Sequence, residues 1–328
     1  MLNQAFVVNK TQEGKFTSGI EALSIPTIED KEVLIKVTYS SLNFKDALSS
    51  TGNPGVTRKF PHVTGIDAAG VIEKSNSADF QKGDEVLVTG YDLGMNTDGG
   101  HQSFVKVPEA WVIKKPANIS DKEIMTYGTA GLTAGLSVNE LLTNGVTPQS
   151  GEILVTGATG GVGSLSIAIL SKLGFDIVAI SGKEEMIPFL KELGAKEVIL
   201  RKDFDIENKK PMMKERFAGV IDTVGGNILG EALKLMKYDG VATCCGLTSS
   251  FLLNTNVFPF ILRGVRLIGI DSVECKIDKK LAIWQKLSNE FNVDSLTNIV
   301  NEITLEDLPT AYEALLGGKA VGRYLVKI

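Results

Sequence analysis

Residues 153–183 read ILVTGATGGVGSLSIAILSKLGFDIVAISGK, and this stretch decides the fold. A short apolar run, Ile153–Val155, predicts a buried strand, and a second run, Ile177–Ile180, predicts another. Between them apolar residues recur at helical spacing, and Gly174 is positioned to end a helix. Strand, helix and strand in this order predict a βαβ unit with parallel strands.

A glycine-rich turn joins the first of these strands to the helix. Its regularly spaced glycines are Gly157, Gly160 and Gly163, a spacing that differs from the common G-x-G-x-x-G pattern. Small residues let the backbone approach a pyrophosphate, and a helix N-terminus offers unpaired N–H groups and the positive end of its dipole. The position of the turn between strand and helix therefore predicts a dinucleotide site.

The end of the second strand indicates which dinucleotide binds. NAD enzymes place Asp or Glu there to accept the ribose 2′-hydroxyl, whereas this chain has Ser181, Gly182 and Lys183. A hydroxyl and an ammonium suit a 2′-phosphate, which a carboxylate would repel. The following Glu184 and Glu185 suit the first turn of a helix. We therefore expect NADP, the alternative being that Lys183 is a solvated surface lysine.

Composition excludes several classes of protein. A chain of 328 residues favours two domains, and 43% hydrophobic residues is ordinary for a globular protein. The net charge of −5 argues against general affinity for nucleic acid or anionic membranes. The N-terminal sequence MLNQAFVVNK lacks the apolar segment of a secretory signal, and three cysteines, two of them adjacent, make no disulfide framework. We therefore expect a cytoplasmic protein.

The first part of the chain, residues 1–120, is predicted to be rich in β-strands. Short apolar or alternating segments separated by turn signals predict a partly open β-barrel. These segments are Ala5–Val8, Glu32–Val37, Ala68–Ile72, Glu85–Thr89 and Phe104–Val107.

After a predicted helix over residues 121–143, the predicted strands alternate with helices. Six candidate parallel strands predict a doubly wound sheet. They are Ile153–Thr156, Ile177–Ser181, Glu197–Leu200, Val220–Thr223, Gly240–Cys245 and Leu267–Ile270. Helices are expected over Glu184–Leu193, Leu229–Met236, Lys279–Phe291 and Leu308–Leu316, and a final strand over Arg323–Ile328. We expect one domain from residues 1–120 and 295–328, and a dinucleotide-binding domain from residues 121–294.

Several motifs resemble those of a known family. They are YSSLNFKDA (residues 39–47), GID (65–67), GTAG (128–131), VTGATGGVG (155–163), PFILR (259–263) and GIDSV (269–273). Together they resemble the medium-chain dehydrogenase/reductase superfamily, in its YhdH/AcuI-type branch of quinone oxidoreductases. The resemblance implies an α/β protein with a GroES-like β-barrel domain and a Rossmann domain that has a doubly wound parallel sheet. It also implies the activity of the branch, NADPH-dependent acrylyl-CoA reduction.

The resemblance also indicates what this chain lacks. Zinc-containing relatives have a cysteine near position 43 and a Gly-His-Glu sequence near Gly65, where this chain has Asn43 and Gly-Ile-Asp. A catalytic zinc takes three protein ligands and one open position. No cysteine precedes Cys244, and the histidines are only His62 and His101. We therefore expect no metal site.

The resemblance implies which residues of this chain contact NADPH. The residues implied for the nicotinamide half are Phe44 and Thr129. Those implied for the pyrophosphate are Thr159, Gly160, Gly161 and Val162. Those implied for the 2′-phosphate are Ser181, Gly182, Lys183 and Arg201, although Arg201 also fits a solvated charged run. Those implied along the path from adenine to nicotinamide are Leu247, Ile261 and Ser272.

Reduction of an enoyl thioester without metal needs hydrogen-bond donors at the thioester oxygen, where negative charge develops. The amide of Asn43 is the first candidate donor, because it stands where zinc-containing relatives have a ligand. Lys45 is a candidate for contributing charge, Asp46 for orienting a donor, and Tyr91 for supplying a proton. The alternatives are that Asp46 anchors a turn and that Tyr91 is an ordinary buried aromatic.

Three functions remain open from the sequence. The favoured one is an NADPH-dependent reductase of a small enoyl thioester such as acrylyl-CoA. The second is an NADPH-dependent quinone reductase whose site admits a flat ring. The third is a non-catalytic NADPH sensor or RNA-binding protein, against which the acidic charge balance counts. By analogy we expect a homodimer that joins sheet edges at Leu267–Ile270.

Overall fold

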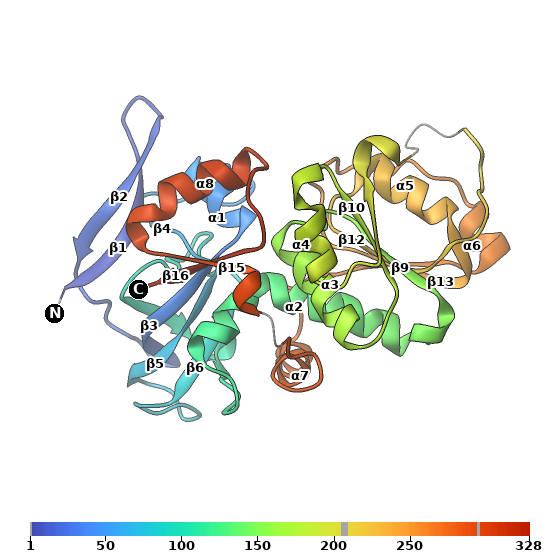
Figure 1. Ribbon diagram of the computed structural model, residues 1–328. Helices are drawn as coiled ribbons and strands as arrows, with labels where there is room; N and C mark the ends of the chain where they lie inside the picture. The colour runs from blue at the N-terminus through green and yellow to red at the C-terminus, as the bar shows by residue number, and fades with distance from the viewer. Residues whose placement is uncertain (1, 205–208, 294–295) are drawn as a thin grey trace. The chain divides into compact units, whose positions relative to one another are not determined.

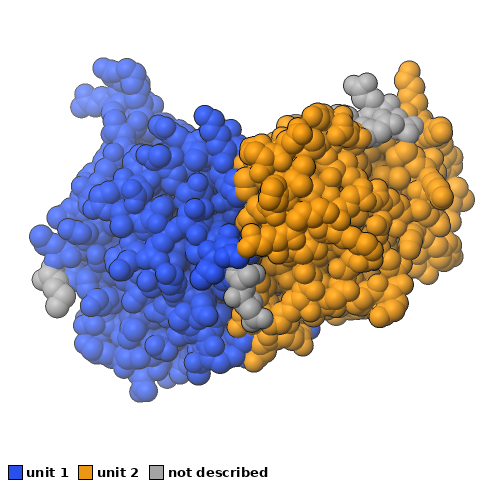
Figure 2. Space-filling view, viewed as in Figure 1, with its two compact units in different colours: residues 1–129, 273–288, 296–328 blue, residues 130–272, 289–295 orange. Residues whose placement is uncertain are grey.

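The computed structural model describes residues 2–204, 209–293 and 296–328. The chain divides into two compact units, which Figure 2 shows in different colours. Unit 1 contains Met1–Thr129, Val273–Ser288 and Leu296–Ile328, and unit 2 contains Ala130–Ser272 and Asn289–Ser295. No described helix is both long enough and apolar enough to cross a membrane.

The division into units differs from the domain boundaries predicted from the sequence. The predicted boundary at residues 294 and 295 lies outside the described residues, so it stays a prediction. The segment Val273–Ser288, predicted to lie in the dinucleotide-binding domain, groups with unit 1. Hydrogen bonds explain this grouping, because the backbone N–H of Tyr91 donates to the carbonyl of Val273 and the ammonium of Lys280 donates to the carbonyl of Thr89.

Unit 2 is built on a six-stranded sheet with the strand order β11-β10-β9-β12-β13-β14. The strands are β9 (Glu152–Val155), β10 (Ile177–Ser181), β11 (Glu197–Leu200), β12 (Phe217–Asp222), β13 (Met236–Cys244) and β14 (Arg266–Gly269). Every neighbouring pair is parallel, which confirms the predicted doubly wound sheet. Leu154, Val178, Val220 and Ala242 are buried in its core.

The order of strands reverses direction beside β9, and this decides where the helices lie. Right-handed crossovers from β9 to β10 and from β12 to β13 run in opposite directions along the sheet, so their helices cover opposite faces. These helices are α3 (Gly161–Lys172) and α5 (Gly226–Lys234), which Figure 1 shows beside α4 (Ile187–Glu192) and α6 (Phe258–Arg263), respectively. Such a reversal is where doubly wound sheets bind ligands.

Two helices of unit 2 differ from the sequence prediction in their bounds. The predicted helix 184–193 begins as a 3₁₀ turn, η3 (Glu184–Met186), because Pro188 suits only the first turn of α4. The predicted helix 229–236 runs instead from Gly226 to Lys234, and Met236 already belongs to β13. Two further 3₁₀ turns are η2 (Pro148–Ser150) and η4 (Arg201–Asp203).

Unit 1 contains the β-rich part predicted from the sequence. Its larger sheet has the order β15-β16-β3-β5-β6-β8, with β7 paired to β3, and its smaller sheet has the order β2-β1-β4. The larger sheet contains β3 (Glu32–Leu42), β5 (Asp67–Ser75), β6 (Glu85–Thr89), β7 (Phe104–Pro108), β8 (Ile113–Lys114), β15 (Val300–Ile303) and β16 (Arg323–Lys327). The smaller sheet contains β1 (Asn3–Lys10), β2 (Phe16–Leu23) and β4 (His62–Val63). The C-terminal strand therefore rejoins the N-terminal part, as predicted.

The remaining elements of unit 1 lie around these sheets. They are α1 (Phe44–Ser50), α7 (Ile277–Leu287), α8 (Leu308–Leu316), η1 (Glu109–Trp111), η5 (Leu296–Asn298) and η6 (Leu305–Asp307). Helix α2 (Asp121–Thr143) is interrupted at Gly128, where φ is 49° and ψ is −154°. The division between the units falls directly after this interruption, at Thr129.

Strand register gathers polar residues at one end of the larger sheet. Asp67 begins β5 and lies opposite Thr89, the last residue of β6. Leu42 ends β3 opposite Tyr324 of β16. Residues from β3, β5, β16 and the start of α1 therefore meet there.

Candidate functional site

The glycine turn of unit 2 has the geometry of an anion cradle. Gly157 adopts a φ of 58°, and a Cβ there would lie 2.2 Å from Thr223 Oγ1. A Cβ at Gly163 would lie 2.4 Å from the carbonyl oxygen of Gly157, so only glycine permits this close packing of α3 on the turn. Gly160 is the N-cap of α3, which therefore presents its free N–H groups at the end of β9.

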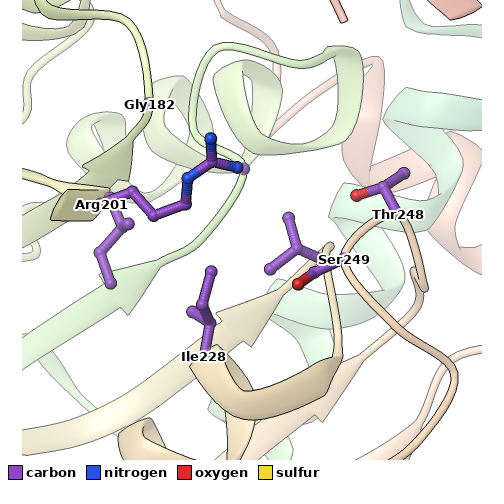
Figure 3. Close-up of a pocket in the computed structure, with 8 residues that line it drawn as sticks. Gly182, Arg201, Ile228, Thr248 and Ser249 are labelled. Atoms are coloured by element: carbon purple, nitrogen blue, oxygen red, sulfur yellow. The ribbon is translucent and has the colours of Figure 1, made fainter. Parts of the chain in front are cut away.

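A pocket opens beside this turn at the carboxyl ends of the strands. It is lined by Gly157, Ile180, Gly182, Arg201, Val224, Ile228, Thr248 and Ser249. Figure 3 shows the guanidinium of Arg201 alongside Gly182, with Thr248 and Ser249 on another wall. A cation and hydroxyl groups around glycine backbone fit a phosphorylated nucleotide.

Two charged residues that follow β11 make different kinds of contact. Lys202 forms an ion pair with Glu184 at 3.2 Å on the surface. A Cβ at Gly182 would lie 3.2 Å from Nη2 of Arg201, so that guanidinium lies directly over the turn after β10. Of the two interpretations of Arg201, this geometry favours a lining residue over a solvated member of a charged run.

The turn after β10 is shaped by its own hydroxyl. The side chain of Ser181 is buried, and its Oγ accepts a hydrogen bond of 2.9 Å from the backbone N–H of Lys183. Burial lowers the pKa of the Lys183 ammonium from its ordinary value. Ser181 therefore orients the turn that carries Gly182 and Lys183.

The other residues predicted to contact NADPH are spread over several elements. Thr159, Gly160, Gly161 and Val162 are together in the glycine turn and the first turn of α3. Leu247 follows β13 and Ile261 lies in α6, with exposed fractions of 66% and 67%. Ser272 is buried and accepts a hydrogen bond of 2.8 Å from the hydroxyl of Thr133. In unit 1, Phe44 begins α1 and is exposed.

A buried carboxylate that the sequence analysis did not single out supports the glycine turn. Asp222, at the end of β12, accepts hydrogen bonds from the hydroxyl of Thr156 at 2.6 Å and from the N–H of Gly225 at 2.7 Å. Burial raises the pKa of its carboxyl above the ordinary value. Asp222 thus ties the loop after β12 to the end of β9.

Unit 1 contains a second polar cluster, centred on Asp67. This fully buried carboxylate accepts hydrogen bonds from Ser41 Oγ at 2.5 Å and from Asn43 Nδ2 at 2.8 Å. It also accepts hydrogen bonds from the backbone N–H of Thr129 at 2.8 Å and from the Thr129 hydroxyl at 2.5 Å. Because a buried charge needs donors, these bonds stabilise the carboxylate and fix the side chains that supply them.

Arg323, the first residue of β16, joins this cluster. Its buried guanidinium donates to Ser41 Oγ at 2.8 Å and to the backbone carbonyls of Thr126 and Leu42. Burial lowers the pKa of Arg323, and the charge of Asp67 opposes this effect. A cation thus reaches the buried carboxylate through one serine hydroxyl.

The amide of Asn43 is held in one orientation. Its Nδ2 donates to Asp67 at 2.8 Å and to Ser41 Oγ at 3.3 Å, while its Oδ1 lies 3.4 Å from Nη1 of Arg323 as an acceptor. A rotated amide would set its oxygen against the carboxylate. Gly128 completes the cluster, because a Cβ there would lie 2.4 Å from Ser41 Oγ and 2.6 Å from Asp67 Oδ2.

Asp46 and Lys45 follow Asn43 in α1 but have other surroundings. Asp46 is fully buried and accepts hydrogen bonds from the backbone N–H groups of Asn43, Gly65 and Ile66. Burial, aided by the charge of Asp67, raises the pKa of Asp46 to about 7. The Nζ of Lys45 lies 3.9 Å from the sulfur of Met95. These contacts favour an anchoring role for Asp46.

Tyr91 follows the end of β6, just beyond the register partner of Asp67. Its backbone has a φ of 53°, and its ring stacks on Trp111 with centroids 5.7 Å apart. Burial raises the pKa of its phenol, as do Cys275 and Glu274.

Two families match the two parts of the chain. Residues 29–117 match the alcohol dehydrogenase GroES-like domain, and residues 161–289 match the zinc-binding dehydrogenase family. Over 310 residues the chain is 43% identical to YhfP of Bacillus subtilis, named as a quinone oxidoreductase, with 94% of each chain covered. It is 38% identical over 325 residues to acrylyl-CoA reductase AcuI of Ruegeria pomeroyi, covering 99% of this chain and 98% of AcuI. The chain belongs to the medium-chain dehydrogenase/reductase family.

Solved structures agree with this family membership and with its YhdH/AcuI-type branch. The YhdH oxidoreductase of Salmonella enterica, solved in complex with NADP, superposes with a TM-score of 0.95 at 40% identity and 99% coverage of both chains. YhfP of Bacillus subtilis, solved with NAD bound, gives a TM-score of 0.96 at 42% identity over both whole chains.

The histidines of this family member make hydrogen bonds within unit 1. His62 Nε2 lies 3.0 Å from the carbonyl of Gly94, and His101 Nδ1 lies 2.9 Å from the hydroxyl of Thr64. Within residues 2–204, 209–293 and 296–328, no group of three or more His, Cys, Asp or Glu side chains is arranged to hold a metal ion.

The sequence predicted a role for Asn43, which stays a prediction, but gave none to the residues that hold it. Asp67 lies in the motif GID and Arg323 begins the predicted final strand, yet neither was assigned a role. The available signal was a pair of opposite charges at the starts of β5 and β16. The pairing of β16 with β3 brings Arg323 to Ser41 and so makes the pair recognisable.

Proposed function

We propose that this protein is an NADPH-dependent oxidoreductase that reduces the C=C bond of a small enoyl thioester such as acrylyl-CoA. The observation that carries the proposal is the fixed amide of Asn43 beside the buried Asp67 carboxylate. A hydrogen-bond donor held in one orientation is what a developing oxyanion requires. The likeness to AcuI and to the NADP complex of YhdH supports this assignment.

The residues of unit 2 fit the cofactor. We assign the pyrophosphate to the residues of the glycine turn: Thr159, Gly160, Gly161 and Val162. The 2′-phosphate is assigned to the turn after β10 together with Arg201, whose guanidinium lies over Gly182. Phe44, Thr129, Leu247, Ile261 and Ser272 remain predicted contacts. When bound, NADPH supplies the hydride.

The reaction adds a hydride to the β-carbon and a proton to the α-carbon of the substrate. As the C=C bond breaks, its electron pair moves toward the thioester carbonyl, and the oxygen gains negative charge. Asn43 donates to that oxygen the N–H that otherwise contacts Ser41 Oγ at 3.3 Å, while Asp67 and Arg323 prevent the amide from rotating. Tyr91 gives its phenolic proton to the α-carbon and recovers a proton from water.

Steady-state kinetics test the proposal. We expect acrylyl-CoA to accelerate NADPH oxidation and Asn43→Ala to lower kcat by about 100-fold, the effect of losing one oxyanion donor. Thr51→Ala is the control, because Thr51 is the C-cap at the other end of α1 and is exposed. Acceleration by a benzoquinone but not by acrylyl-CoA would replace the proposal with the quinone reductase, which the name of YhfP supports.

We also propose a cytoplasmic homodimer. Strand β14 is the last strand of its sheet, and α6 and the preceding loop expose large apolar side chains. These are Phe251, Leu252, Val257, Ile261 and Leu262. An open edge beside apolar surface favours pairing with a second copy. Cys244 and Cys245 are free thiols, which suits a reducing compartment.

A further inference from the structure

A buried lysine lies beneath the predicted proton donor of unit 1. Lys280, in α7, is 0% exposed, which is unusual for lysine unless its charge is compensated. Its Nζ donates to the carbonyl of Thr89 at 2.7 Å and to the carbonyl of Val273 at 2.9 Å. The same Nζ lies 3.4 Å from the centroid of the Tyr91 ring, which is the geometry of a close cation–π contact.

The contacts of Lys280 hold Tyr91 by its backbone as well as by its ring. The carbonyl of Val273 accepts both the Lys280 ammonium and, at 3.1 Å, the N–H of Tyr91. Trp111 stacks on the ring at an interplanar angle of 13°. Tyr91 is therefore fixed with its left-handed backbone, where φ is 53°.

The location of this arrangement links it to the Asp67 cluster. Thr89, whose carbonyl binds Lys280, is the register partner of Asp67 in the β5–β6 ladder. Tyr91 comes two residues after Thr89, so it follows the strand end that lies opposite Asp67. Asp67 in turn accepts the hydrogen bond from Asn43. The proton donor and the oxyanion donor belong to the same end of one sheet.

We propose that Lys280 is a positioning residue for Tyr91: its ammonium fixes the ring and stabilises the phenolate that remains when Tyr91 gives its proton to the substrate. This inference rests on the proposed function. The O–H bond of Tyr91 breaks as the bond from hydrogen to the α-carbon forms. The electron pair stays on the phenolate, whose ring faces the Lys280 ammonium, until water returns a proton.

Charges around Tyr91 explain why the phenol needs a cation. Burial, Cys275 and Glu274 all raise the pKa of the phenol and so weaken it as an acid. A nearby cation acts in the opposite direction, because it favours the charged form. Removing Lys280 takes away a cation that lies 3.4 Å from the ring centroid and favours the phenolate, so we expect the phenol to become a weaker proton donor.

A spectroscopic titration tests the coupling without substrate. The tyrosinate absorbance of the protein minus that of Tyr91→Phe reports the pKa of Tyr91. We expect Lys280→Met to raise this pKa and Lys280→Arg, which keeps the charge, to restore it toward the native value. Lys115→Met is the matched control, because the side chain of Lys115, also in unit 1, is only 5% exposed but pairs with Glu85 and Asp121. Near-UV circular dichroism verifies the fold of each variant at every pH.

Kinetics with acrylyl-CoA then separate this inference from the proposed function. We expect Tyr91→Phe to lower kcat by about 100-fold. Lys280→Met should lower kcat by about tenfold and move the alkaline limb of the pH profile upward, with Lys280→Arg restoring both. An unchanged Tyr91 pKa in folded Lys280→Met overturns the inference. A raised pKa with unchanged kcat in Lys280→Met and Tyr91→Phe instead overturns the proton-donor role in the proposed function.

Discussion

Gly128 occupies a position that no other residue can fill without disturbing the Asp67 cluster. Its φ of 49° is unfavourable for residues with a side chain, and a Cβ would lie within 3 Å of Ser41 Oγ, Asp67 Oδ2 and Arg323 Nη2. The missing side chain lets the Thr129 N–H reach the carboxylate. Gly128 is therefore needed both for the close packing around Ser41 and Arg323 and for the hydrogen bond from Thr129 to Asp67.

We predict that Gly128→Ala destabilises the protein by about 2–4 kcal/mol, from backbone strain and overlap with buried polar atoms. Urea unfolding followed by circular dichroism measures this free energy. Gly19→Ala in β2 is the control, because a Cβ there meets no atom within 4 Å. Equal stabilities of the two variants would contradict the close approach described for Gly128.

His101 gives the stability of unit 1 a definite pH dependence. Burial lowers its pKa from 6.5 to about 3, so the unfolded chain binds a proton between these values that the folded chain does not. Stability must therefore fall as pH falls through this window, by about 1.4 kcal/mol per pH unit.

We predict that His101→Gln has a shallower loss of stability between pH 6.5 and about 3 than the native protein. Other groups, including Asp46, titrate in both proteins, so their contributions cancel in the difference. Urea unfolding at a series of pH values gives the two slopes. Parallel slopes would show that the imidazole is not held neutral by burial.

We propose that the turn after β10 and the 3₁₀ turn η4 together recognise the 2′-phosphate. Arg201 comes from η4, and its guanidinium lies over Gly182 of the other turn. We predict that Arg201→Gln raises the Kd for NADPH by about tenfold, with little change for NADH, because one charge-assisted bond to the 2′-phosphate is lost. Fluorescence titration with both dinucleotides measures this effect.

The neighbouring Lys202 provides the control for that prediction. It pairs with Glu184 on the surface, so Lys202→Gln should leave both affinities nearly unchanged. If Arg201→Gln weakened NADH as much as NADPH, Arg201 would not distinguish the 2′-phosphate.

Elements with a strong pattern could be predicted closely from the sequence. The ranges of β10, β11 and α8 agree with prediction, because apolar runs and helical periodicity mark them. Strand β2 was missed because it is largely exposed and carries little apolar signal. The start of α5 was missed because Gly225 and Gly226, both at positive φ, shape the entry into the helix, where Gly225 forms a β-bridge with Ser250.

The candidate site could be predicted only in part, for a similar reason. Local motifs identify the glycine turn and Asn43, because each is a short stretch with its own chemistry. The hydrogen bond from Arg323 to Ser41 joins residues 282 positions apart, and only the pairing of β16 with β3 creates it. The stacking of Tyr91 on Trp111 and its contact with Lys280 likewise depend on tertiary packing.

We propose that the whole molecule assembles through the open edge of the unit 2 sheet. We predict a homodimer by light scattering at micromolar protein and a shift to monomer in Leu262→Glu, because a charge would be buried in the apolar patch. Leu262 is 58% exposed in the single chain. Leu2→Glu, at an exposed apolar residue of unit 1, should leave the mass unchanged. A native monomer would reject the proposed dimer.

Isotope transfer tests the central claim about the whole molecule most directly. The native protein is incubated with acrylyl-CoA and NADPH that carries deuterium on its transferable position, and the product is examined by NMR. The account predicts propionyl-CoA with the deuterium on its β-carbon and a solvent-derived hydrogen on its α-carbon. Recovery of unreduced acrylyl-CoA, or of product without deuterium on the β-carbon, would contradict it.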